Sequence, residues 1–232
     1  MGEKFPVASE YYRYQLTITK ILEYAVRTFP ISEIAYRDQL IRSYIQEYQR
    51  IQRLSNCLED LGVAKGDVVA TLDWNTPQHY EAYFGVPCMG AILHTLNPRF
   101  SLDELKYVIN QAEDKFILVN EEFIGLLEPI KDELKTVQGY IVITQRDQLP
   151  KTSLEPVYHY EQLISKSKPE YEYPELDENS VAGICFTSGT TGLPKGAYFT
   201  HRAFVLHTMC VTMLQAFHER YGLSPSLSLI HI

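Results

Sequence analysis

Short apolar runs alternate with helix-length amphipathic segments along most of this 232-residue chain. Residues 68–72 (Val-Val-Ala-Thr-Leu) and 140–144 (Tyr-Ile-Val-Ile-Thr) have the length and composition of buried strands. Residues 45–61 carry apolar side chains at helical spacing and precede Gly62, a residue type that favours the end of a helix. This alternation predicts an α/β fold with mostly parallel sheets flanked by helices.

The same patterns predict the remaining elements. Further strands are expected at residues 34–37, 41–44, 91–95, 116–119 and 181–186. Further helices are expected at residues 19–29, 75–86, 101–111, 121–134, 160–164 and 201–217, and Ser101 with Glu104 forms a capping-box pattern at the start of one of them. Residues 145–178 contain four prolines among many charged and serine residues, which is typical of a surface connection.

A loop rich in Gly, Ser and Thr lies between the strand at 181–186 and the helix at 201–217, giving the order strand, loop, helix. Glycine lets the backbone take positive φ and approach a ligand, and successive N–H groups in such a loop form an anion-binding concavity. Hydroxyls can contact phosphate oxygens or magnesium, and Lys195 supplies a positive charge. We therefore expect a polyphosphate to bind at Thr187, Ser188, Gly189, Thr190, Thr191, Gly192 and Lys195.

This loop differs from the common P-loop, in which Gly, four residues and then Gly-Lys-Ser/Thr follow one another. After Gly189 and four further residues stands Pro194, and Lys195 is followed by Gly196. The competing interpretation is a flexible surface loop without a ligand, since Gly/Ser/Thr clusters often are loops of that kind. A lysine at the end of the loop, a proline before it and ordered elements on both sides favour phosphate binding.

The string Thr-Ser-Gly-Thr-Thr-Gly-Leu-Pro-Lys-Gly at 187–196 resembles the signature loop of the adenylate-forming superfamily, which includes acyl-CoA synthetases, firefly luciferase and the adenylation domains of peptide synthetases. Residues 200–202 (Thr-His-Arg) look like the family's usual continuation. Trp-Asn-Thr at 74–76, Gly-Ala-Ile-Leu-His-Thr-Leu-Asn-Pro-Arg at 90–99 and Glu-Asp-Lys at 113–115 resemble the fatty acyl-CoA synthetase branch. The resemblance covers roughly residues 16–223.

The resemblance implies an AMP-forming ligase of medium- or long-chain fatty acids. A fatty acid carboxylate would attack the α-phosphorus of ATP to give acyl-AMP and pyrophosphate, and the thiol of coenzyme A (CoA) would then displace AMP. Thr187 would carry the hydroxyl linked to Mg²⁺, and Lys195 would hold phosphate charge. The essential lysine of the family lies near the far C-terminus, so no residue of this chain is assigned as catalytic.

His94, Asn97 and Arg99 lie at a predicted strand end and turn. Catalysis is the alternative, but we interpret these residues as structural, because isolated His and Asn residues at turns usually satisfy local backbone groups.

The resemblance also predicts that the chain is the N-terminal part of the large domain of such an enzyme, truncated and inactive by itself. Family members are more than twice as long, and the aromatic-Gly-x-Thr-Glu stretch, the ribose-binding Asp, the hinge and the C-terminal lysine have no equivalents here. Two alternatives stay open, an adenylating enzyme for another carboxylic acid and a non-catalytic nucleotide-binding fragment.

Three parts are expected along the chain. Residues 1–16 form an N-terminal arm, 17–178 a first α/β subdomain that ends in the Pro- and charge-rich connection at 145–178, and 179–232 the start of a second α/β subdomain with the phosphate loop. The arm is rich in tyrosine, which is enriched at interfaces, so a homodimer contact is compatible with it; packing on its own domain is equally compatible.

Composition restricts the remaining classes. A net charge of −8 argues against nucleic acid as a partner. Cys57, Cys88, Cys185 and Cys210 are far apart and form no Cys-x-x-Cys pair, which argues against zinc and for free thiols in a reducing compartment. No secretory signal pattern and no apolar run long enough to span a membrane are present, so we expect a cytoplasmic protein.

Overall fold

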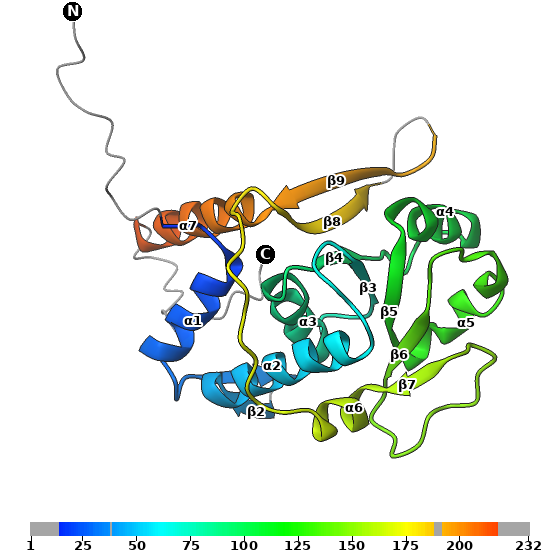
Figure 1. The fold of residues 1–232 in the computed structure, drawn as a ribbon, viewed down its shortest axis with the longest axis horizontal. Helices are drawn as coiled ribbons and strands as arrows, with labels where there is room; N and C mark the ends of the chain where they lie inside the picture. Colours follow the sequence, from blue (N-terminus) through cyan, green and yellow to red (C-terminus); the bar gives the residue numbers. More distant parts are fainter. Residues whose placement is uncertain (1–13, 38, 188–191, 218–232) are drawn as a thin grey trace, which may run out of the picture.

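The computed structural model describes residues 14–37, 39–187 and 192–217, and its centre is a seven-stranded sheet (Figure 1). Across the sheet the strands follow the order β7 (Val157–His159), β6 (Gly139–Ile143), β5 (Asp114–Asn120), β3 (Val68–Leu72), β4 (Ile92–Thr95), β8 (Val181–Thr187) and β9 (Lys195–Thr200). Neighbouring strands run parallel except β8 and β9, which are antiparallel. The predicted α/β fold with a mainly parallel sheet is confirmed.

Helices cover both faces of this sheet (Figure 1). Ala70 and Leu72 of β3 pack with α4 (Leu102–Ala112) and α5 (Ile124–Leu127). Val69, which points to the opposite face, packs with α2 (Tyr44–Asp60), α3 (Pro77–Cys88) and α6 (Tyr160–Lys166). Because successive side chains of a strand alternate between faces, one apolar strand contributes to two cores.

The helix starts follow the sequence signals. Ser43 and Gln46 form a capping box at the start of α2, and Ser101 and Glu104 form another at the start of α4. The Thr76 hydroxyl accepts a hydrogen bond from the His79 amide at the start of α3. Each cap satisfies a backbone N–H that has no partner inside its helix.

A third apolar cluster brings the first and last described helices together beside the sheet. It contains α1 (Ile18–Thr28), which packs against α2, α3 and α7 (His201–Phe217). The hairpin of β1 (Glu33–Tyr36) and β2 (Gln39–Ser43) leads from α1 into α2, and its strands overlap those expected at residues 34–37 and 41–44. The Ile18 amide donates a hydrogen bond to Nδ1 of the buried His201, 3.3 Å away, which ties α1 to the start of α7.

The predicted helix at 121–134 is wrong. The structure has three short pieces there, the 3₁₀ turns η1 (Glu121–Phe123) and η2 (Lys131–Glu133) with α5 between them. Pro129 follows α5 and has no amide hydrogen to donate, so a continuous helix through residue 134 would lose a backbone hydrogen bond.

Two strands were not predicted. β7 lies inside the proline-rich connection and has three residues, too few for a periodic signal. β9 lies directly after the glycine-rich loop, so the expected order of strand, loop and helix is corrected to strand, loop, strand and helix. The side chains of β9 do not alternate between buried and exposed, which removes the period of two that identifies a half-buried strand.

The division into parts at residue 178 stays a prediction, and in the structure the sheet continues across it because β8 pairs with β4. Residues 1–13 of the predicted arm lie outside the described residues. At its end, the Leu16 amide donates to Oε2 of Glu178 at 2.8 Å, and the Glu178 amide donates to Oε1 of Gln15 at 3.0 Å. At residues 15 and 16, therefore, the chain contacts its own domain.

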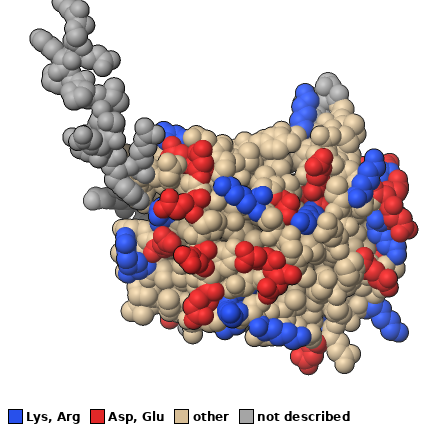
Figure 2. Space-filling model, viewed as in Figure 1, with Lys and Arg blue, Asp and Glu red and all other residues tan. Residues whose placement is uncertain are grey.

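The surface view shows both acidic and basic side chains on the visible face (Figure 2). Within the described part of the chain, no helix has the length and apolar character needed to cross a membrane.

Candidate functional site

The glycine-rich loop connects the two antiparallel strands at one edge of the sheet. Thr187, the last residue of β8, lies opposite Lys195, the first residue of β9, and both are exposed. Gly192 has a φ of 144°, a backbone region that side chains strongly disfavour. The structure thus brings Thr187, Gly192 and Lys195 to the base of one loop, whereas the predicted residues Ser188, Gly189, Thr190 and Thr191 lie outside the described residues.

The Lys195 ammonium is available for a ligand. Its side chain is exposed and forms no hydrogen bond or ion pair with the other described residues. Pro194, just before it, is buried and has a restricted φ, so it fixes the direction in which the loop enters β9. A solvated cation at the end of a glycine-rich turn can neutralise phosphate charge.

Gly196 is required for packing inside the hairpin. It lies opposite Phe186, and a Cβ atom at Gly196 would come within 3.1 Å of the Phe186 ring. Gly196 is not among the described glycines with a positive φ, so its role is steric. The absence of a side chain at Gly196 makes room for Phe186 at the base of the loop.

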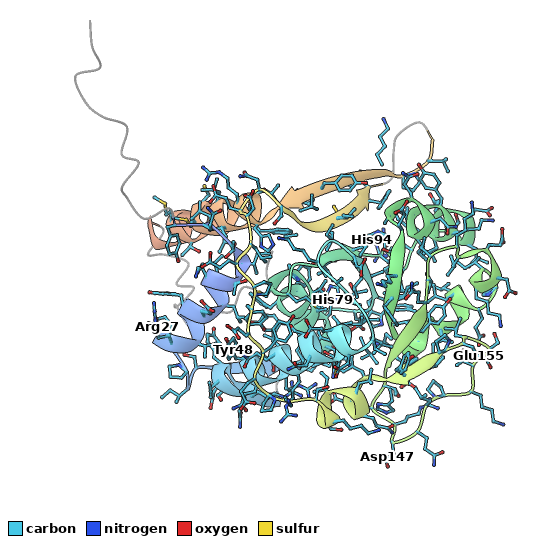
Figure 3. The ribbon with its side chains drawn as sticks, in the orientation of Figure 1. Arg27, Tyr48, His79, His94, Asp147 and Glu155 are labelled. Carbon is cyan, nitrogen blue, oxygen red and sulfur yellow. The ribbon has the colours of Figure 1, made fainter. Side chains whose placement is uncertain are left out.

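The interpretation of His94, Asn97 and Arg99 as structural agrees with their contacts. His94 is fully buried in β4, and its Nδ1 lies 2.9 Å from each carboxylate oxygen of Asp114 (Figure 3). Oδ1 of Asn97 accepts a hydrogen bond from the Arg99 amide at 3.0 Å, which closes a local turn. Burial raises the pKa of the Asp114 carboxyl, while His94 beside it acts in the opposite direction.

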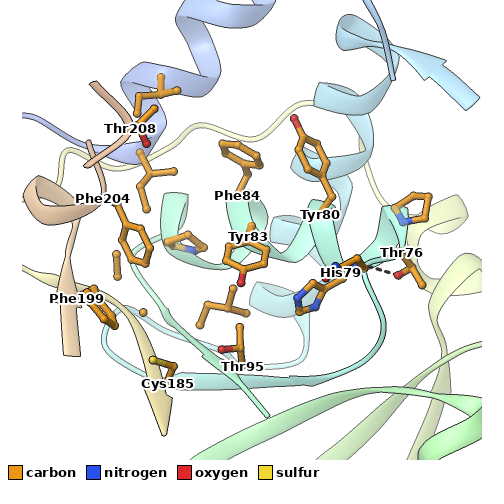
Figure 4. Close-up of a pocket in the computed structure, with 18 of the residues that line it drawn as sticks. Thr76, His79, Tyr80, Tyr83, Phe84, Thr95, Cys185, Phe199, Phe204 and Thr208 are labelled. Atoms are coloured by element: carbon orange, nitrogen blue, oxygen red, sulfur yellow. Dashed lines mark hydrogen bonds between the residues drawn. The ribbon is translucent and has the colours of Figure 1, made fainter. Parts of the chain in front are cut away.

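Sequence reasoning missed a cavity of about 600 Å³ beside the strands that lead to the loop (Figure 4). Tyr80 and Tyr83 of α3 line it together with Cys185 of β8 and Phe204 of α7. Its walls are mainly apolar, and its volume is in the range of small-molecule sites. Burial lowers the pKa of His79, another lining residue, to about 4, so this imidazole is neutral at pH 7.

A buried ionic network, also missed, joins three helices away from the loop. Arg50 of α2 donates through Nε to Oε1 of the fully buried Glu81 of α3 at 2.6 Å, and through Nη2 to Oε1 of Glu161 of α6 at 2.8 Å. The hydroxyl of Tyr160 donates to Oε2 of Glu81 at 2.6 Å. Each charge named here has a close partner, so the network connects the three helices and would be costly to break at one partner only.

Fold and loop together define an α/β protein whose glycine-rich loop joins the last two strands at a sheet edge. The chain belongs to the AMP-binding enzyme family, whose model matches residues 22–232.

Several curated proteins similar to this chain are named as CoA ligases. The chain is 38% identical over 224 residues to a long-chain-fatty-acid–CoA ligase of Thermus thermophilus, covering 94% of this chain and 40% of the relative. It is 32% identical over 226 residues to a medium-chain-fatty-acid–CoA ligase of Ectopseudomonas oleovorans, covering 95% and 41%. A 3-methylmercaptopropionyl-CoA ligase of Ruegeria pomeroyi is 38% identical over 157 residues, covering 68% and 29%. The chain therefore spans about 40% of the length of the first two relatives.

A solved structure shows the same fold. The anthranilate CoA ligase AuaEII in complex with anthranoyl-AMP matches with a TM-score of 0.75 at 23% identity, over 85% of this chain and 37% of that chain. At this identity the likeness concerns the fold alone, and it agrees with the arrangement of a mainly parallel sheet between two helical layers.

Proposed function

We propose that this chain carries the ATP-phosphate-binding part of an AMP-forming fatty acid–CoA ligase. The observation that carries the proposal is the family match together with the hairpin loop, in which Thr187 and Lys195 face each other at the loop base. The names of the two relatives that align along nearly the whole chain support a medium- or long-chain fatty acid as the substrate class.

In the proposed reaction a fatty acid carboxylate oxygen attacks the α-phosphorus of ATP, and pyrophosphate leaves. The thiol of CoA then attacks the acyl carbonyl of the acyl-AMP, and AMP leaves. The chain's own contribution to this reaction is to position and neutralise the triphosphate. Lys195 would offset negative charge on the phosphates, and the loop N–H groups would fix their orientation.

Magnesium fits this arrangement as a partner of the nucleotide. Mg²⁺ usually keeps water and phosphate ligands and uses one or two protein oxygens. The exposed Thr187 hydroxyl, next to the loop, fits the role of one protein oxygen. Among the described residues no group of three or more His, Cys, Asp or Glu side chains could hold the ion alone, which is consistent with a site completed by the phosphates.

The cavity provides a place for an alkyl chain near this loop. Cys185 lines the cavity and precedes Thr187 by two residues on β8. A mainly apolar space favours a fatty acid over a small polar acid, because burial of methylene groups supplies the binding energy, about 0.8 kcal/mol each.

An adenylating enzyme for another acid is the second candidate. The Ruegeria relative is as similar in percentage identity as the Thermus relative, although it is named for 3-methylmercaptopropionate. The third candidate is a nucleotide-binding fragment without catalysis, which the loop alone would support.

The proposal is tested by ATP–pyrophosphate exchange with a panel of acids, measured on a full-length enzyme that contains this chain, together with ATP titration of the chain itself. Exchange that depends on palmitate or octanoate supports a fatty acid ligase. Exchange that depends instead on aryl, amino or thioether acids moves the assignment to the second candidate. ATP binding without exchange for any acid favours the fragment, and absence of ATP binding overturns the proposal. The cytoplasmic location and the homodimer stay predictions.

A further inference from the structure

A line of four residues runs from the middle of the sheet to the base of the phosphate loop. Asp114 starts β5, and both of its carboxylate oxygens lie 2.9 Å from Nδ1 of His94 on β4. The imidazole ring lies 5.1 Å from the Phe186 ring, measured between centroids. The Phe186 ring in turn occupies the space beside Gly196, its partner across β8 and β9.

The polar end of this line is costly to bury. Asp114 and His94 are both completely inaccessible to solvent, and Nε2 of His94 has no hydrogen-bond partner among the described residues. Replacing a buried ionic or polar pair with well-packed apolar residues often leaves stability unchanged or improves it. A contribution to stability alone therefore does not account for burying Asp114 and His94, and the unpaired Nε2 needs a separate explanation.

The Asp114–His94 pair connects to the base of the loop through the Phe186 ring. Both carboxylate oxygens of Asp114 lie within hydrogen-bond distance of Nδ1, so the carboxylate anchors the Nδ1 edge of the imidazole. The imidazole limits the positions open to the Phe186 ring, which stands one residue before Thr187. Phe186 also sets how closely β9 approaches at Gly196, one residue after Lys195. The Phe186 ring thus lies next to both ends of the loop, at Thr187 and at Lys195.

We propose that Asp114 and His94 are positioning residues for the phosphate loop, acting through Phe186 on the strand pair that closes it. The proposal rests on the ATP site proposed above for its functional consequence. Its structural part, the control of the β8–β9 base by the buried pair, can be measured without a nucleotide.

The test compares two Phe→Leu variants. Phe186→Leu removes the ring under the loop, and Phe116→Leu removes a buried ring on the other face of the sheet, where it packs with α2, α3 and α6. Hydrogen exchange of peptides spanning 181–200 is measured first. Phe186→Leu and His94→Phe should raise exchange of the β8–β9 amides several-fold, while Phe116→Leu should leave it unchanged.

ATP affinity gives the second readout. Phe186→Leu should raise the ATP dissociation constant about five- to tenfold. In the double variant Phe186→Leu/His94→Phe, the fold-change should be much smaller than the product of the fold-changes of the two single variants, because contacting residues act non-additively. Asp114→Asn, which keeps an oxygen acceptor for Nδ1, should restore most of the affinity lost in Asp114→Leu. A structural role alone would not produce this rescue.

The outcomes separate the two proposals. Equal effects of Phe186→Leu and Phe116→Leu on exchange at 181–200 would overturn the positioning role, whatever the affinity for ATP. Raised exchange at the loop base in a chain that does not bind ATP would support the positioning role and reject the proposed function. Raised exchange with strict additivity in ATP affinity would also count against coupling through Phe186.

Discussion

Thr187 and Lys195 are opposite partners in the β8–β9 ladder, so a hydroxyl stands at one end of the glycine-rich loop and an ammonium at the other.

Removing the loop cation should weaken nucleotide binding. Lys195→Met should raise the ATP dissociation constant about tenfold or more, since a hydrogen bond to a charged group contributes about 1.5–3 kcal/mol. The effect should shrink at high salt, because Lys195 is exposed and its charge is screened. Lys151→Met, at an exposed lysine in the proline-rich connection, is the control and should leave affinity unchanged. Equal ATP dissociation constants for the two variants would show that Lys195 does not contact the nucleotide.

A methyl group at Gly196 should disturb the hairpin. Gly196→Ala places Cβ 3.1 Å from the Phe186 ring, and overpacking of this kind costs about 1–3 kcal/mol of unfolding free energy. Gly125→Ala in α5 is the matched control, because nothing lies within 4 Å of the added Cβ. Urea unfolding of both variants measures the difference, and a fully stable Gly196→Ala variant would show that the ring moves freely.

Breaking the buried ionic network should be costly. Glu81→Gln leaves the Arg50 guanidinium with a weakened partner in a buried setting, and we expect a loss of about 3 kcal/mol in unfolding free energy. Glu161→Gln is the control, because its side chain is 38% exposed and also bonds to Arg50, so it should cost under about 1 kcal/mol. Similar losses in both variants would contradict the ranking by burial.

Stability should fall in acid through His201. Burial lowers the pKa of His201 to about 4, against 6.5 for an unperturbed histidine. Between these values the unfolded chain binds more protons than the folded one, so unfolding free energy rises with pH and is lost as pH falls from 6.5 towards 4. His201→Gln should flatten this pH dependence by about 2–3 kcal/mol, whereas His207→Gln, at an exposed position on the same helix, should not. Parallel pH profiles for wild type and His201→Gln would refute the assignment.

Filling the cavity should change the preferred acid. Cys185 lines the cavity, so Cys185→Phe should weaken binding of palmitate about tenfold or more and affect hexanoate less, since lost burial scales with chain length. Cys210→Phe, at an exposed cysteine of α7 that does not line the cavity, is the matched control. Unchanged palmitate binding in Cys185→Phe would place the alkyl chain elsewhere.

The sequence was informative where one local rule decides the structure. Ser101 with Glu104, and the apolar run at 68–72, predicted a helix start and a central strand that the structure contains. The sequence was uninformative where a strand lacks an alternating pattern, as in β9. At residues 121–134 the sequence did contain the decisive signal, Pro129, but the helical pattern around it was given more weight.

Relations across the sheet could not be predicted from the sequence. His94 and Asp114 are 20 positions apart in the sequence. Their strands, β4 and β5, are the two neighbours of β3, and the two side chains meet across it. The cavity combines α1, α3, β8 and α7, each of which has an ordinary apolar surface when taken alone. The residue pattern located the loop in the sequence. The pairing of Thr187 with Lys195 could not be predicted, because it requires β9, a strand that the sequence did not reveal.

The central claim, that this loop binds the phosphates of ATP, is tested most directly by calorimetric titration of the chain with Mg·ATP, followed by competition. The account predicts saturable binding that pyrophosphate displaces and adenosine does not, with a dissociation constant raised in Lys195→Met. Absence of saturable binding at millimolar ATP, or displacement by adenosine and not by pyrophosphate, would contradict it.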